Sequence, residues 1–366
     1  MNRILIFAND DLVIYKCRKE LVQKLLKDYE VHLCIKKFKW YDELEKMGCK
    51  ITYIDVDRNG TNIKNDIKLF FEYRKIKEKI NPDVILTYNI KPNIYANLFS
   101  NCKKQIAIVN ITGLGKAVEN VGILQKLTVF LYKIAMKNVR CIFFQNQENM
   151  NFFKYRSIGN YDRYKLLPGS GVNLDQYQVL PYPDENEGIH FLFIARVMKE
   201  KGIEEYFEAA KRIKEKHPNT FFHVLGFCEE NYKEKLEKYQ KQGIILYEGM
   251  QEDILKFQKI SHCTIHPSYY PEGMSNVCLE SAACGRPVIT TDRSGCRETV
   301  DNGETGYIIK QQDVDDLVEK IERFLSLPYE EKRQMGLNGR AKMEKQFDRQ
   351  IIIDAYIDEI NNILKN

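Results

Sequence analysis

The sequence predicts an α/β protein made of two doubly wound parallel sheets in tandem. Short apolar runs alternate with longer, helix-periodic segments, which is the pattern of βαβ units in a parallel sheet. The alternation loosens after Asn146 and restarts at Ile189. A length of 366 residues with 44% hydrophobic content suits two domains of ordinary size. We therefore expect one domain over residues 1–172 and a second over 173–346, facing each other across a cleft at the carboxyl ends of their strands.

The strands of the first domain are predicted from apolar runs that are rich in β-branched and aromatic residues. In order, these runs are "RILIFA" from Arg3, "EVHLCI" from Glu30, "KITYID" from Lys50, "DVILTY" from Asp83, "QIAIVNI" from Gln105 and "CIFFQN" from Cys141. Segments rich in Lys and Glu, with helical periodicity, separate several of them.

The second domain repeats this pattern after "YQVLPYPDENEG" (177–188), a polar and Pro-containing stretch that is typical of a linker. Its predicted strands are "IHFLFIAR" from Ile189, "TFFHVLGF" from Thr220, "IILYEGM" from Ile244, "HCTIHPS" from His262, "RPVITTD" from Arg286 and "TGYIIK" from Thr305. The tail from about 347 to 366 carries apolar residues at helical spacing, so we expect an amphipathic helix that packs back on the first domain.

Composition narrows the class of protein. No 18-residue apolar run is present, so a transmembrane helix is not expected. A strand that begins at Arg3 leaves no room for a signal peptide. The ten Cys are scattered without a C-x-x-C pair, which favours reduced thiols in a cytosol over disulfides or a zinc site.

The charge is unevenly distributed along the chain. Residues 1–175 carry 30 Lys and Arg against 18 Asp and Glu, a net charge of +12, whereas the remainder carries −7. A basic half beside an acidic half predicts an anionic partner for the first half: a membrane, a nucleic acid or a phosphorylated substrate.

Two short motifs resemble known binding sites, but each lacks a residue that such a site requires. "TGLGKAV" (112–118) begins like the dinucleotide-binding G-x-G-x-x-G motif, but Val118 takes the place of the third glycine. Gly113 and Gly115 instead predict a tight βα turn in which the backbone approaches another group closely. "DVD" (55–57) has the spacing of a metal-binding D-x-D, but no third ligand is evident, and a strand end entering a turn explains it more simply.

The second half contains a candidate diphosphate site. "FIARVMKEKG" places Arg196 just after a predicted strand and Lys201 at the start of the next helix. Arg can fork two phosphate oxygens and Lys supplies a mobile point charge, which together suit a diphosphate. Taken alone, the same two residues are also compatible with solvated surface charge.

"HPSYYPEGMSNVCLE" supplies a partner for these cations. A helix is predicted to begin near Ser275 and Asn276, and a helix N-terminus carries partial positive charge that suits a phosphate. Glu280 lies about one turn inside the helix and Glu272 lies in the preceding loop. Carboxylates accept hydrogen bonds from hydroxyls, so a ribose diol suits Glu280 and a sugar suits Glu272. Together with Arg196 these features describe a site for a nucleotide-diphosphate sugar.

At these residues the chain resembles glycosyltransferase family 4, retaining enzymes of the GT-B fold with two Rossmann-like domains. "EGMSNVCLE" matches the family's loop Glu and helix Glu with seven residues between them, and "HPSYYPEG", "ESAACGRPVITTDRSGCRETV" and "IARVMKEKGIEEYFEA" extend the match. "TYNIKPNIYAN" and "NITGLGKAVEN" look like the branch that extends undecaprenyl-diphosphate-linked oligosaccharides for bacterial surface polysaccharides or glycoproteins.

The resemblance implies roles for individual residues. Arg196 and Lys201 would hold the donor diphosphate, Glu272 would contact the transferred sugar, and Glu280 would contact the ribose. These roles need no metal and no cofactor. The other donor-side candidates are Gly226, Met250, Asp253, Gly273, Met274, Ser275 and Asn276. The acceptor-side candidates are Asn9, Asp10, Arg18, Lys91, Gly113 and Gly115.

The first domain departs from the family pattern. Many relatives have a Gly-rich loop after the first strand, whereas "FANDDLVIYKCR" has no glycine, and "NITGLG" lacks the His that many relatives carry. A front-side mechanism, in which the donor phosphate takes the acceptor proton, requires no such His. No catalytic base is therefore assigned in this domain.

The expected function is transfer of a hexose or N-acetylhexosamine from a UDP-sugar to a lipid-diphosphate-linked sugar acceptor. The enzyme would be cytoplasmic and peripherally bound to the inner face of an anionic membrane. One alternative is a soluble glycosyltransferase with a non-lipid acceptor. Another is a basic nucleic-acid-binding protein, which would lack any RRM-, KH- or zinc-type signature and leave the two glutamates unexplained.

The stretch "VGILQKLTVFLYKIAMKNV" (121–139) is the predicted membrane contact. Its helical period places Lys126, Lys133 and Lys137 on one face, where each cation would be attracted to anionic lipid. The apolar residues of the same helix are most simply core against the sheet; they are Leu127, Phe130, Leu131 and Ile134.

Overall fold

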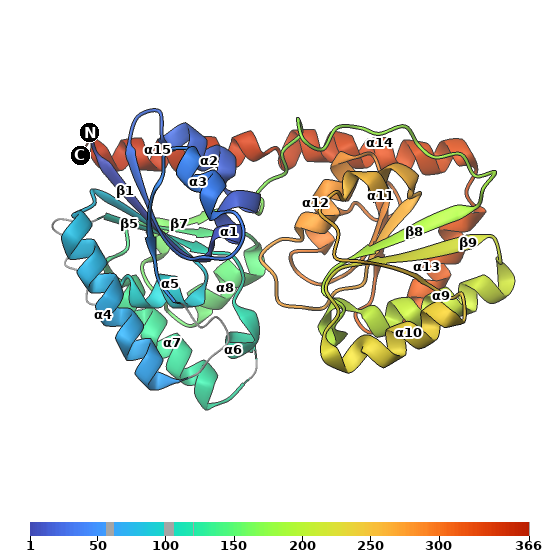
Figure 1. The fold of residues 1–366 in the computed structure, drawn as a ribbon, viewed down its shortest axis with the longest axis horizontal. Coiled ribbons are helices and arrows are strands. Elements are labelled where there is room, and N and C mark those ends of the chain that lie inside the picture. Colours follow the sequence, from blue (N-terminus) through green and yellow to red (C-terminus); the bar gives the residue numbers. More distant parts are fainter. Residues whose placement is uncertain (56–61, 99–105, 120, 366) are drawn as a thin grey trace. The chain divides into compact units, whose positions relative to one another are not determined.

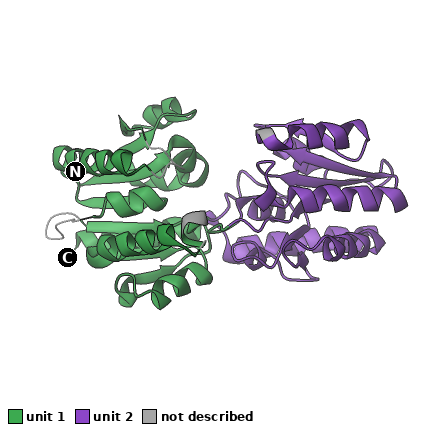
Figure 2. Cartoon of the chain, turned by 90° about the horizontal axis from the view of Figure 1, so that it is seen from below, with its two compact units in different colours: residues 1–170, 271–274, 350–366 green, residues 171–270, 275–349 purple. Residues whose placement is uncertain are grey.

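The computed structural model of the chain describes residues 1–55, 62–98, 106–119 and 121–365. Its contacts divide it into two compact units, each a parallel sheet with helices on both faces (Figures 1 and 2). Unit 1 comprises Met1–Ser170, Pro271–Met274 and Gln350–Asn366; unit 2 comprises Gly171–Tyr270 and Ser275–Arg349.

The sheet of unit 1 has seven parallel strands in the order β3-β2-β1-β4-β5-β6-β7. The first six follow the order of a doubly wound nucleotide-binding sheet, whose direction of winding reverses between β1 and β4. The strands are β1 (Arg3–Asp10), β2 (Glu30–Lys36), β3 (Lys50–Tyr53), β4 (Val84–Tyr88), β5 (Ile106–Ile111), β6 (Cys141–Phe144) and β7 (Tyr164–Leu166).

Each central strand of unit 1 is buried on both faces because helices cover both. Along β1, Ile4 and Ile6 point into one apolar cluster and Leu5 and Phe7 into the other, as the two-residue period of a strand requires. The covering helices are α1 (Asp11–Cys17), α2 (Lys19–Leu25), α3 (Tyr41–Lys46), α4 (Ile63–Ile80), α5 (Ile90–Tyr95), α6 (Gly115–Glu119), α7 (Ile123–Ala135), α8 (Gln147–Tyr155) and α15 (Arg349–Leu364).

The C-terminal helix α15 completes the core of unit 1. Its apolar residues Ile352, Tyr356 and Ile360 are buried in the cluster that also holds Ile4 and Ile6 of β1. The Tyr356 hydroxyl donates to Asn110 Oδ1 at the end of β5. The helix therefore covers one face of the sheet alongside α1, α2 and α3 (Figure 1).

Unit 2 repeats the winding order with six parallel strands, β10-β9-β8-β11-β12-β13. The reversal of direction falls between β8 and β11, which places a ligand site at the carboxyl ends of these two strands. The strands are β8 (Ile189–Ile194), β9 (Thr220–Leu225), β10 (Leu246–Gly249), β11 (Cys263–His266), β12 (Val288–Thr291) and β13 (Gly306–Ile309).

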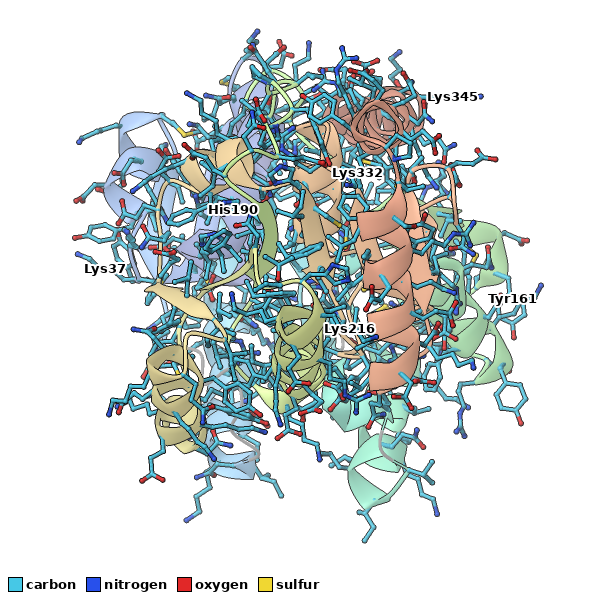
Figure 3. The ribbon with its side chains drawn as sticks, turned by 90° about the vertical axis from the view of Figure 1, so that its right-hand side faces the viewer. Lys37, Tyr161, His190, Lys216, Lys332 and Lys345 are labelled. Atoms are coloured by element: carbon cyan, nitrogen blue, oxygen red, sulfur yellow. The ribbon has the colours of Figure 1, made fainter. Side chains whose placement is uncertain are left out.

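The helices of unit 2 bury apolar faces and present charged ends to solvent. Lys345, close to the end of α14, extends outward, whereas Lys332 of the same helix is buried and pairs with Glu185 Oε1 at 2.8 Å (Figure 3). The helices are α9 (Ile203–Lys216), α10 (Lys233–Lys241), α11 (Leu255–Ile260), α12 (Asn276–Ala283), α13 (Val314–Ser326) and α14 (Tyr329–Gln346).

The strand predictions are confirmed for β1 to β6 and β8 to β13, and the fold class with them. Strand β7 escaped prediction because it has three residues, two of them exposed, and therefore no buried apolar run. It pairs with β6 through Tyr164, Lys165 and Leu166.

The expectation that the apolar face of α7 is entirely core is wrong. Leu131 and Ile134 pack against the core of unit 1, but Leu127 is 47% exposed and Phe130 is 58% exposed. Other residues of the helix, Val129 and Tyr132 among them, are buried in the core. The sheet therefore covers only some of the apolar side chains of α7.

The stretch between Tyr177 and Gly188 has no helix or strand, yet it is held firmly against unit 2. Arg286, which is fully buried, donates to the carbonyl oxygens of Leu180 at 3.2 Å and Pro181 at 2.7 Å. These hydrogen bonds replace the ones that a strand or helix would have supplied. No helix among the described residues is both long enough and apolar enough to cross a membrane.

Candidate functional site

Arg196 and Lys201 both lie where unit 2 reverses its winding. Arg196 follows the end of β8, and Lys201 closes a 3-10 turn (Lys199–Lys201) immediately before α9. Strand β8 pairs with β11, so the segment after His266 leaves the sheet beside them. The structure therefore brings the two predicted cations to the position at which doubly wound sheets bind ligands.

Gly202 explains how Lys201 reaches this position. Its backbone has φ of 76°, in the left-handed region, and a Cβ there would collide with the carbonyl oxygen of Pro267. Glycine alone allows the start of α9 to lie directly against the segment that follows β11. As a result, the Lys201 ammonium lies 5.0 Å from the ring centroid of Tyr270.

The surroundings of Lys201 lower its pKa. Burial, helped by the positive charge of Arg196, lowers the pKa of Lys201 to about 8. The pKa of His266, at the end of β11, is also lowered. Burial and the positive charge of Lys201 lower it to about 3, so the imidazole ring is neutral. A cation in such surroundings gains strongly from an anionic ligand.

His266 is a site residue that the sequence analysis missed. It is 1% exposed, and neither ring nitrogen has a hydrogen-bond partner among the described residues. A buried polar group without a partner is costly, so such a group at a strand end next to Lys201 marks a place where a ligand or water completes the contacts. The only signal in the sequence is the dipeptide His266-Pro267 at the end of a strand.

Arg196 is exposed and already has a weak anionic partner. Its Nη1 atom lies 3.4 Å from Glu229 Oε1, in an ion pair whose side chains are 48% and 36% exposed. Exposed pairs of this kind contribute little to stability, so the guanidinium can exchange Glu229 for a diphosphate at small cost.

Helix α12 begins at Ser275, as the sequence predicts. Ser275 is its N-cap, accepts a hydrogen bond from the Cys278 N–H at 3.4 Å, and donates its own N–H to the Gly295 carbonyl at 2.7 Å. These contacts fix the direction of the first turn, and Asn276 is the first helical residue. The N-terminal end of α12 can therefore stabilise a phosphate.

Glu280 lies one turn further along α12, on a half-buried face. Burial raises the pKa of Tyr177, and the neighbouring Glu280 carboxylate raises it further. The Tyr177 hydroxyl group therefore lies beside this carboxylate, which can accept a hydrogen bond from it.

The remaining donor-side candidates in unit 2 lie along one edge of its sheet. The Gly226 N–H donates to the Gly249 carbonyl at 2.8 Å, which joins the ends of β9 and β10. Met250 is 68% exposed directly after β10, and Asp253 accepts from the Lys256 N–H at 3.3 Å ahead of α11. The structure therefore brings the segments after β9 and β10 together.

Pro271–Met274 belongs to unit 1, where it packs against the turn after β5. A Cβ on Gly113 would lie 3.1 Å from the Pro271 oxygen, and one on Gly273 would lie 2.7 Å from the Thr112 carbonyl carbon. Asn146 donates through Nδ2 to the carbonyl oxygens of Glu272 at 3.1 Å and Gly273 at 2.6 Å. Two glycines and one amide thus hold the backbone of the loop that carries Glu272, and Met274 is buried.

Asn146 was not predicted as a site residue. The strand-like run "CIFFQN" ends on two amides, Gln145 and Asn146, and both are buried. Asn146 also caps α8 by accepting from the Asn149 N–H at 2.8 Å. One side chain therefore ties the carboxyl end of β6 to the loop around Glu272.

Two of the acceptor-side candidates, Asp10 and Arg18, make structural contacts within unit 1. Asp10 caps α1 by accepting from the Val13 N–H at 3.0 Å, so this helix begins directly after β1 without a Gly-rich loop. Arg18 is 3% exposed, donates to the Cys17 carbonyl at 2.8 Å, and lies 5.1 Å from the centroid of Tyr88. Both residues thus hold the fold of unit 1.

Two other candidates lie near the reversal of winding in unit 1. The Asn9 N–H donates to Asn89 Oδ1 at 3.2 Å, which links the ends of β1 and β4. Lys91 follows in α5 and pairs with Asp66 Oδ1 at 2.8 Å. Gly115 begins α6 after the turn that contains Gly113.

No group of three or more His, Cys, Asp or Glu side chains in the described part of the chain is placed to hold a metal ion. Asp55 of the "DVD" stretch pairs with Lys36 Nζ at 2.8 Å, and Asp57 lies outside the described residues.

Comparisons with known families match both halves of the chain. Residues 3–146 match the family model described as Glycosyl transferase 4-like, and residues 182–342 match Glycosyl transferases group 1.

Individual relatives and solved structures agree with these matches. The N,N'-diacetylbacillosaminyl-diphospho-undecaprenol alpha-1,3-N-acetylgalactosaminyltransferase of Campylobacter jejuni is 27% identical over 374 residues, which cover 96% of each chain. The capsular polysaccharide biosynthesis glycosyltransferase CapM of Staphylococcus aureus is 31% identical over about half of each chain.

Two crystal structures share the fold at low sequence identity. Anabaena HepE, solved with UDP and glucose, superposes with a TM-score of 0.80 at 14% identity, covering 99% of this chain and 100% of that one. Sucrose-phosphate synthase from Thermosynechococcus elongatus superposes with a TM-score of 0.83 at 18% identity and full coverage of both chains. With two family models matched in tandem on two doubly wound sheets, the chain belongs to the glycosyltransferases of the GT-B fold.

Proposed function

We propose that the protein is a retaining, metal-independent glycosyltransferase that moves a hexose or N-acetylhexosamine from a UDP-sugar to a lipid-diphosphate-linked sugar. The observation that carries the proposal is the pairing of Arg196 with a half-buried Lys201 at the reversal of winding in unit 2. Two cations and the N-terminal end of α12 supply positive charge for a leaving diphosphate, which is the role a metal ion plays in other transferases.

Each chemical group of the donor would be bound by a different set of residues. Arg196 and Lys201 hold the diphosphate, Glu280 accepts from the ribose hydroxyls, and the backbone around Gly226 and Met250 to Asp253 lies beside the base. Glu272, three residues before the N-cap of α12, contacts the sugar. Asn146 acts as a positioning residue because it donates to the carbonyl oxygens of Glu272 and of Gly273, the residue that follows.

The transfer step needs no protein base. The acceptor hydroxyl oxygen bonds to the anomeric carbon on the face from which the diphosphate leaves, and the bond from that carbon to the phosphate oxygen breaks. The acceptor proton passes to the departing phosphate oxygen, so charge and protons balance. Arg196 and Lys201 stabilise the negative charge that develops on the diphosphate. The alpha-1,3 linkage in the name of the C. jejuni relative is consistent with such a front-side transfer.

A lipid-linked acceptor at an anionic membrane is supported by the surface of unit 1. Lys126, Lys133 and Lys137 are all exposed, and Ile123 and Phe130 of α7 are 87% and 58% exposed. Cations combined with protruding apolar side chains are what an anionic bilayer surface binds. The C. jejuni relative, by its name, acts on an undecaprenol-linked diphosphate sugar.

The proposal is tested by offering the purified protein a panel of UDP-sugars. UDP-glucose, UDP-galactose and their N-acetylated counterparts are compared with GDP- and ADP-sugars, first for protection against thermal unfolding and then for release of the nucleotide. We expect at least one UDP-sugar to protect and to turn over slowly in water, and Arg196→Ala to abolish both effects. Equal protection by all nucleotides, or none by any, would overturn the UDP assignment.

The acceptor is tested separately with undecaprenyl-diphosphate-linked sugars in detergent micelles and with free oligosaccharides. Transfer to the lipid-linked sugars is expected. Efficient transfer to a free sugar alone would instead show the soluble glycosyltransferase.

A further inference from the structure

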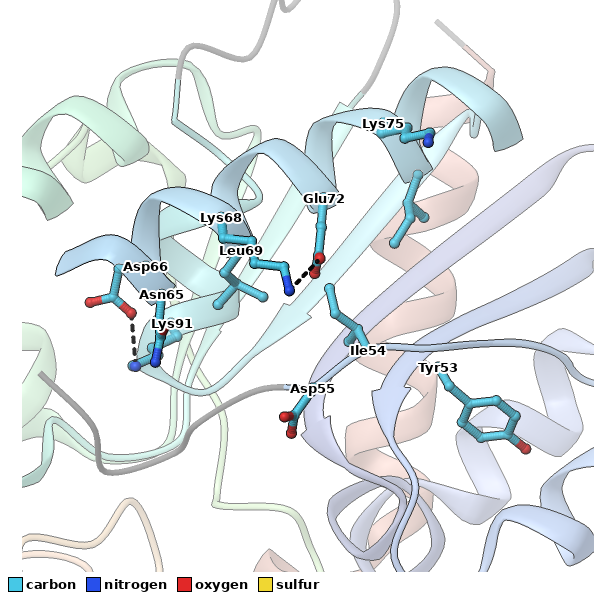
Figure 4. Close-up of a pocket in the computed structure, with 11 residues that line it drawn as sticks. Tyr53, Ile54, Asp55, Asn65, Asp66, Lys68, Leu69, Glu72, Lys75 and Lys91 are labelled. Atoms are coloured by element: carbon cyan, nitrogen blue, oxygen red, sulfur yellow. Dashed lines mark hydrogen bonds and ion pairs between the residues drawn. The ribbon is translucent and has the colours of Figure 1, made fainter. Parts of the chain in front are cut away.

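Shielded polar side chains elsewhere in the chain show how such groups are stabilised. Lys91 pairs with Asp66 Oδ1 at 2.8 Å, where both line a cavity of about 360 Å³ in unit 1 (Figure 4). In unit 2, the buried His223 ring has a partner on each nitrogen: Glu248 Oε1 at 2.9 Å and His190 Nδ1 at 2.9 Å. These contacts replace the ones that water would make, which offsets the cost of burying a polar group.

His266 is an exception among the histidines. It is 1% exposed, and neither ring nitrogen has a hydrogen-bond partner among the described residues. All six histidines of the chain lie in the described part, and each of the other five has at least one ring nitrogen in a hydrogen bond; they are His32, His190, His217, His223 and His262. The neutral ring of His266 therefore has both a donor and an acceptor to offer.

The segment after His266 is fixed against the turn that carries Lys201. The carbonyl of the preceding Glu200 accepts from the Tyr269 N–H at 3.0 Å and from the Ser268 hydroxyl at 3.4 Å. On the other side of Lys201, the N-cap glycine of α9 packs directly against the same segment. Contacts on both sides of Lys201 thus hold its backbone beside the strand end that carries the His266 ring.

Electrostatics also link the His266 ring to the Lys201 ammonium. Burial, together with the positive charge of Lys201, lowers the pKa of His266, so its ring is neutral. Arg196, Cys278 and Cys296 also act on the pKa of Lys201. Burial raises the pKa of both thiols, so they are neutral as well, and a thiol is a weak hydrogen-bond acceptor. Of the ring and the two thiols, the ring is therefore the stronger acceptor for an ammonium.

We propose that His266 is a positioning residue for Lys201. Its neutral ring accepts a hydrogen bond from the ammonium, relayed by one bound water, and holds the cation beside the diphosphate. A buried water needs at least two polar partners, which the ring and the ammonium supply. The Tyr270 ring, with its centroid 5.0 Å from the ammonium, adds a cation–π contact. The proposal rests on the diphosphate site of the proposed function.

This hydrogen bond has a definite effect on the charge of Lys201. An acceptor bonded to an ammonium favours the protonated form, whereas burial favours the neutral amine. Loss of the His266 ring should therefore lower the pKa of Lys201 below its value of about 8. A smaller fraction of the lysine would then be charged at neutral pH.

Other roles suit His266 less well. A catalytic base must reach the proton that it takes, and a ring that is 1% exposed reaches no substrate hydroxyl. A metal site needs further ligands, and the described part of the chain has no group of three His, Cys, Asp or Glu placed for a metal ion. Packing alone would be served by an apolar residue, as Ile265 serves it on the opposite face of the strand.

The first experiment measures the pKa of Lys201 without any nucleotide. The intact protein is treated with limiting acetic anhydride at a series of pH values, and mass spectrometry of the peptide reports how much Lys201 is acetylated, because only the neutral amine reacts. The midpoint should lie near pH 8 in the wild type. It should lie about 1 lower in His266→Phe, a tenfold loss of proton affinity. His266→Gln keeps an acceptor and should stay close to the wild type, whereas a wild-type midpoint in His266→Phe would overturn the proposal.

The matched control lies on the same face of the same strand. Thr264 is 0% exposed, and its hydroxyl has no hydrogen-bond partner among the described residues. Thr264→Val removes a buried polar group of β11 and keeps the shape of the side chain, so the pKa of Lys201 should not change. An equal shift in this control would mean that His266 has no special role. Thermal unfolding checks that each variant is folded, and His266→Leu replaces His266→Phe if the larger ring is not accommodated.

Binding of UDP tests whether the effect reaches the diphosphate. The UDP affinity of His266→Phe should fall with rising pH about one pH unit earlier than the affinity of the wild type. In a Lys201→Met background, His266→Phe should cause no further loss beyond about twofold, because the ammonium through which it acts is already absent. Independent, additive losses from the two substitutions would overturn the positioning role.

The two proposals fail in different ways. If the wild type binds neither UDP nor a UDP-sugar, the proposed function fails, and the acetylation midpoints still decide whether His266 acts on Lys201. If UDP binds and Lys201→Met weakens it, but His266→Phe keeps the wild-type midpoint and pH profile, the proposed function stands and His266 has no positioning role.

Discussion

The two units share one winding order, but they differ in where their polar, charged and exposed apolar side chains lie. In unit 2, a half-buried lysine, a buried histidine and an N-capping serine gather at the carboxyl ends of β8 and β11 and after them. In unit 1, the corresponding strand ends are occupied by structural contacts such as the Asp10 cap and the buried Arg18, while apolar and basic side chains lie on the outside of α4 and α7.

This difference follows the charge distribution of the chain. The first 175 residues carry +12 and the rest −7, although the proposed diphosphate site lies in the acidic half. A few cations held at strand ends are enough to bind a nucleotide diphosphate, whereas a surface potential needs many cations spread over exposed helices. Under the proposed function, net charge therefore predicts which surface binds a membrane, and local geometry predicts which site binds the nucleotide.

The sharpest test of this comparison removes the cations of unit 2. Arg196→Ala and Lys201→Ala should each lower turnover by about 10²-fold or more, which is roughly 2.7 kcal/mol of transition-state stabilisation. Steady-state kinetics with a UDP-sugar measure the loss. Arg212→Ala, which breaks exposed ion pairs elsewhere in unit 2, is the control and should stay near the wild-type rate. A double mutant of Arg196 and Lys201 with wild-type turnover would end the diphosphate assignment.

Reversing the charge on unit 1 should affect membrane binding instead. Replacing Lys126, Lys133 and Lys137 by Glu should weaken co-sedimentation with anionic vesicles by about tenfold or more, because each cation near such a surface adds up to ~1 kcal/mol of attraction. Salt at about 0.5 M should reverse wild-type binding, since screening then acts within a few Å. Slow hydrolysis of UDP-sugar should persist.

The control for that prediction places the same charge change on unit 2. Lys233, Lys238 and Lys241 are exposed on α10, and their replacement by Glu should leave vesicle binding unchanged. Ile123→Ser with Phe130→Ser should reduce the part of the binding that resists salt. Lys126 and Lys133 lie on α7, and Lys137 lies in the 3-10 turn that follows it (Met136–Asn138). Vesicle binding by the triple mutant at the wild-type level would mean that this segment does not face the membrane.

The two glutamates should separate nucleotide from sugar. Glu280→Ala is expected to weaken binding of UDP by about tenfold, the loss of one or two hydrogen bonds to a charged group. Glu272→Ala should bind UDP normally and fail in sugar transfer, because UDP has the ribose but not the sugar. Calorimetric titration with UDP, run beside transfer kinetics, measures both. Equal losses of UDP affinity in the two variants would contradict the division of roles.

The depressed pKa of Lys201 gives a smaller, pH-dependent effect. Its ammonium is charged below a pKa of about 8 and loses its proton as the pH rises through that value. Affinity for a UDP-sugar, whose diphosphate keeps its charge over this range, should therefore be highest near neutral pH and fall several-fold above pH 8. Lys201→Arg remains charged and should remove this pH dependence, even if its affinity is lower. A flat wild-type profile would show that Lys201 stays protonated for another reason.

Removal of metal ions should have the smallest effect. Activity is expected to survive excess EDTA, because Arg196, Lys201 and the N-terminal end of α12 supply the positive charge. Activity measured before and after chelation, and again with added Mn²⁺ or Mg²⁺, checks this. Loss on chelation with recovery on adding either ion would contradict a metal-independent mechanism and make Asp55, which pairs with Lys36, a candidate metal ligand.

The sequence located most of the strands and the start of α12, for reasons that are local. A strand buried on both faces is a continuous apolar run, so β1, β4, β5 and β8 could be recognised without knowledge of their neighbours. β7 could not, because it is short and largely exposed and becomes a strand only by pairing with β6. The N-cap at Ser275 was also visible, since a serine before a helical pattern satisfies its own first turn.

The burial of α7 shows where such reasoning fails. Its period predicts one apolar face correctly, but the period does not say how far the sheet extends beneath the helix. Leu131 and Ile134 lie over the core, whereas Leu127 and Phe130 lie beyond it. All four residues were expected to be buried, but only two of them are packed against the core and the other two are largely exposed.

The sequence by itself determined properties that depend on composition and local patterns. These are two α/β units, an uneven charge, and two glutamates around the start of a helix that comes after an Arg and a Lys in the chain. Only the tertiary structure decided that Gly202 packs against Pro267, that Asn146 holds the backbone beside Glu272, and that Lys201 and His266 share a buried position. These contacts join residues that are tens to more than a hundred positions apart. Their geometry depends on how strands and helices pack, and short-range sequence patterns carry no record of that packing.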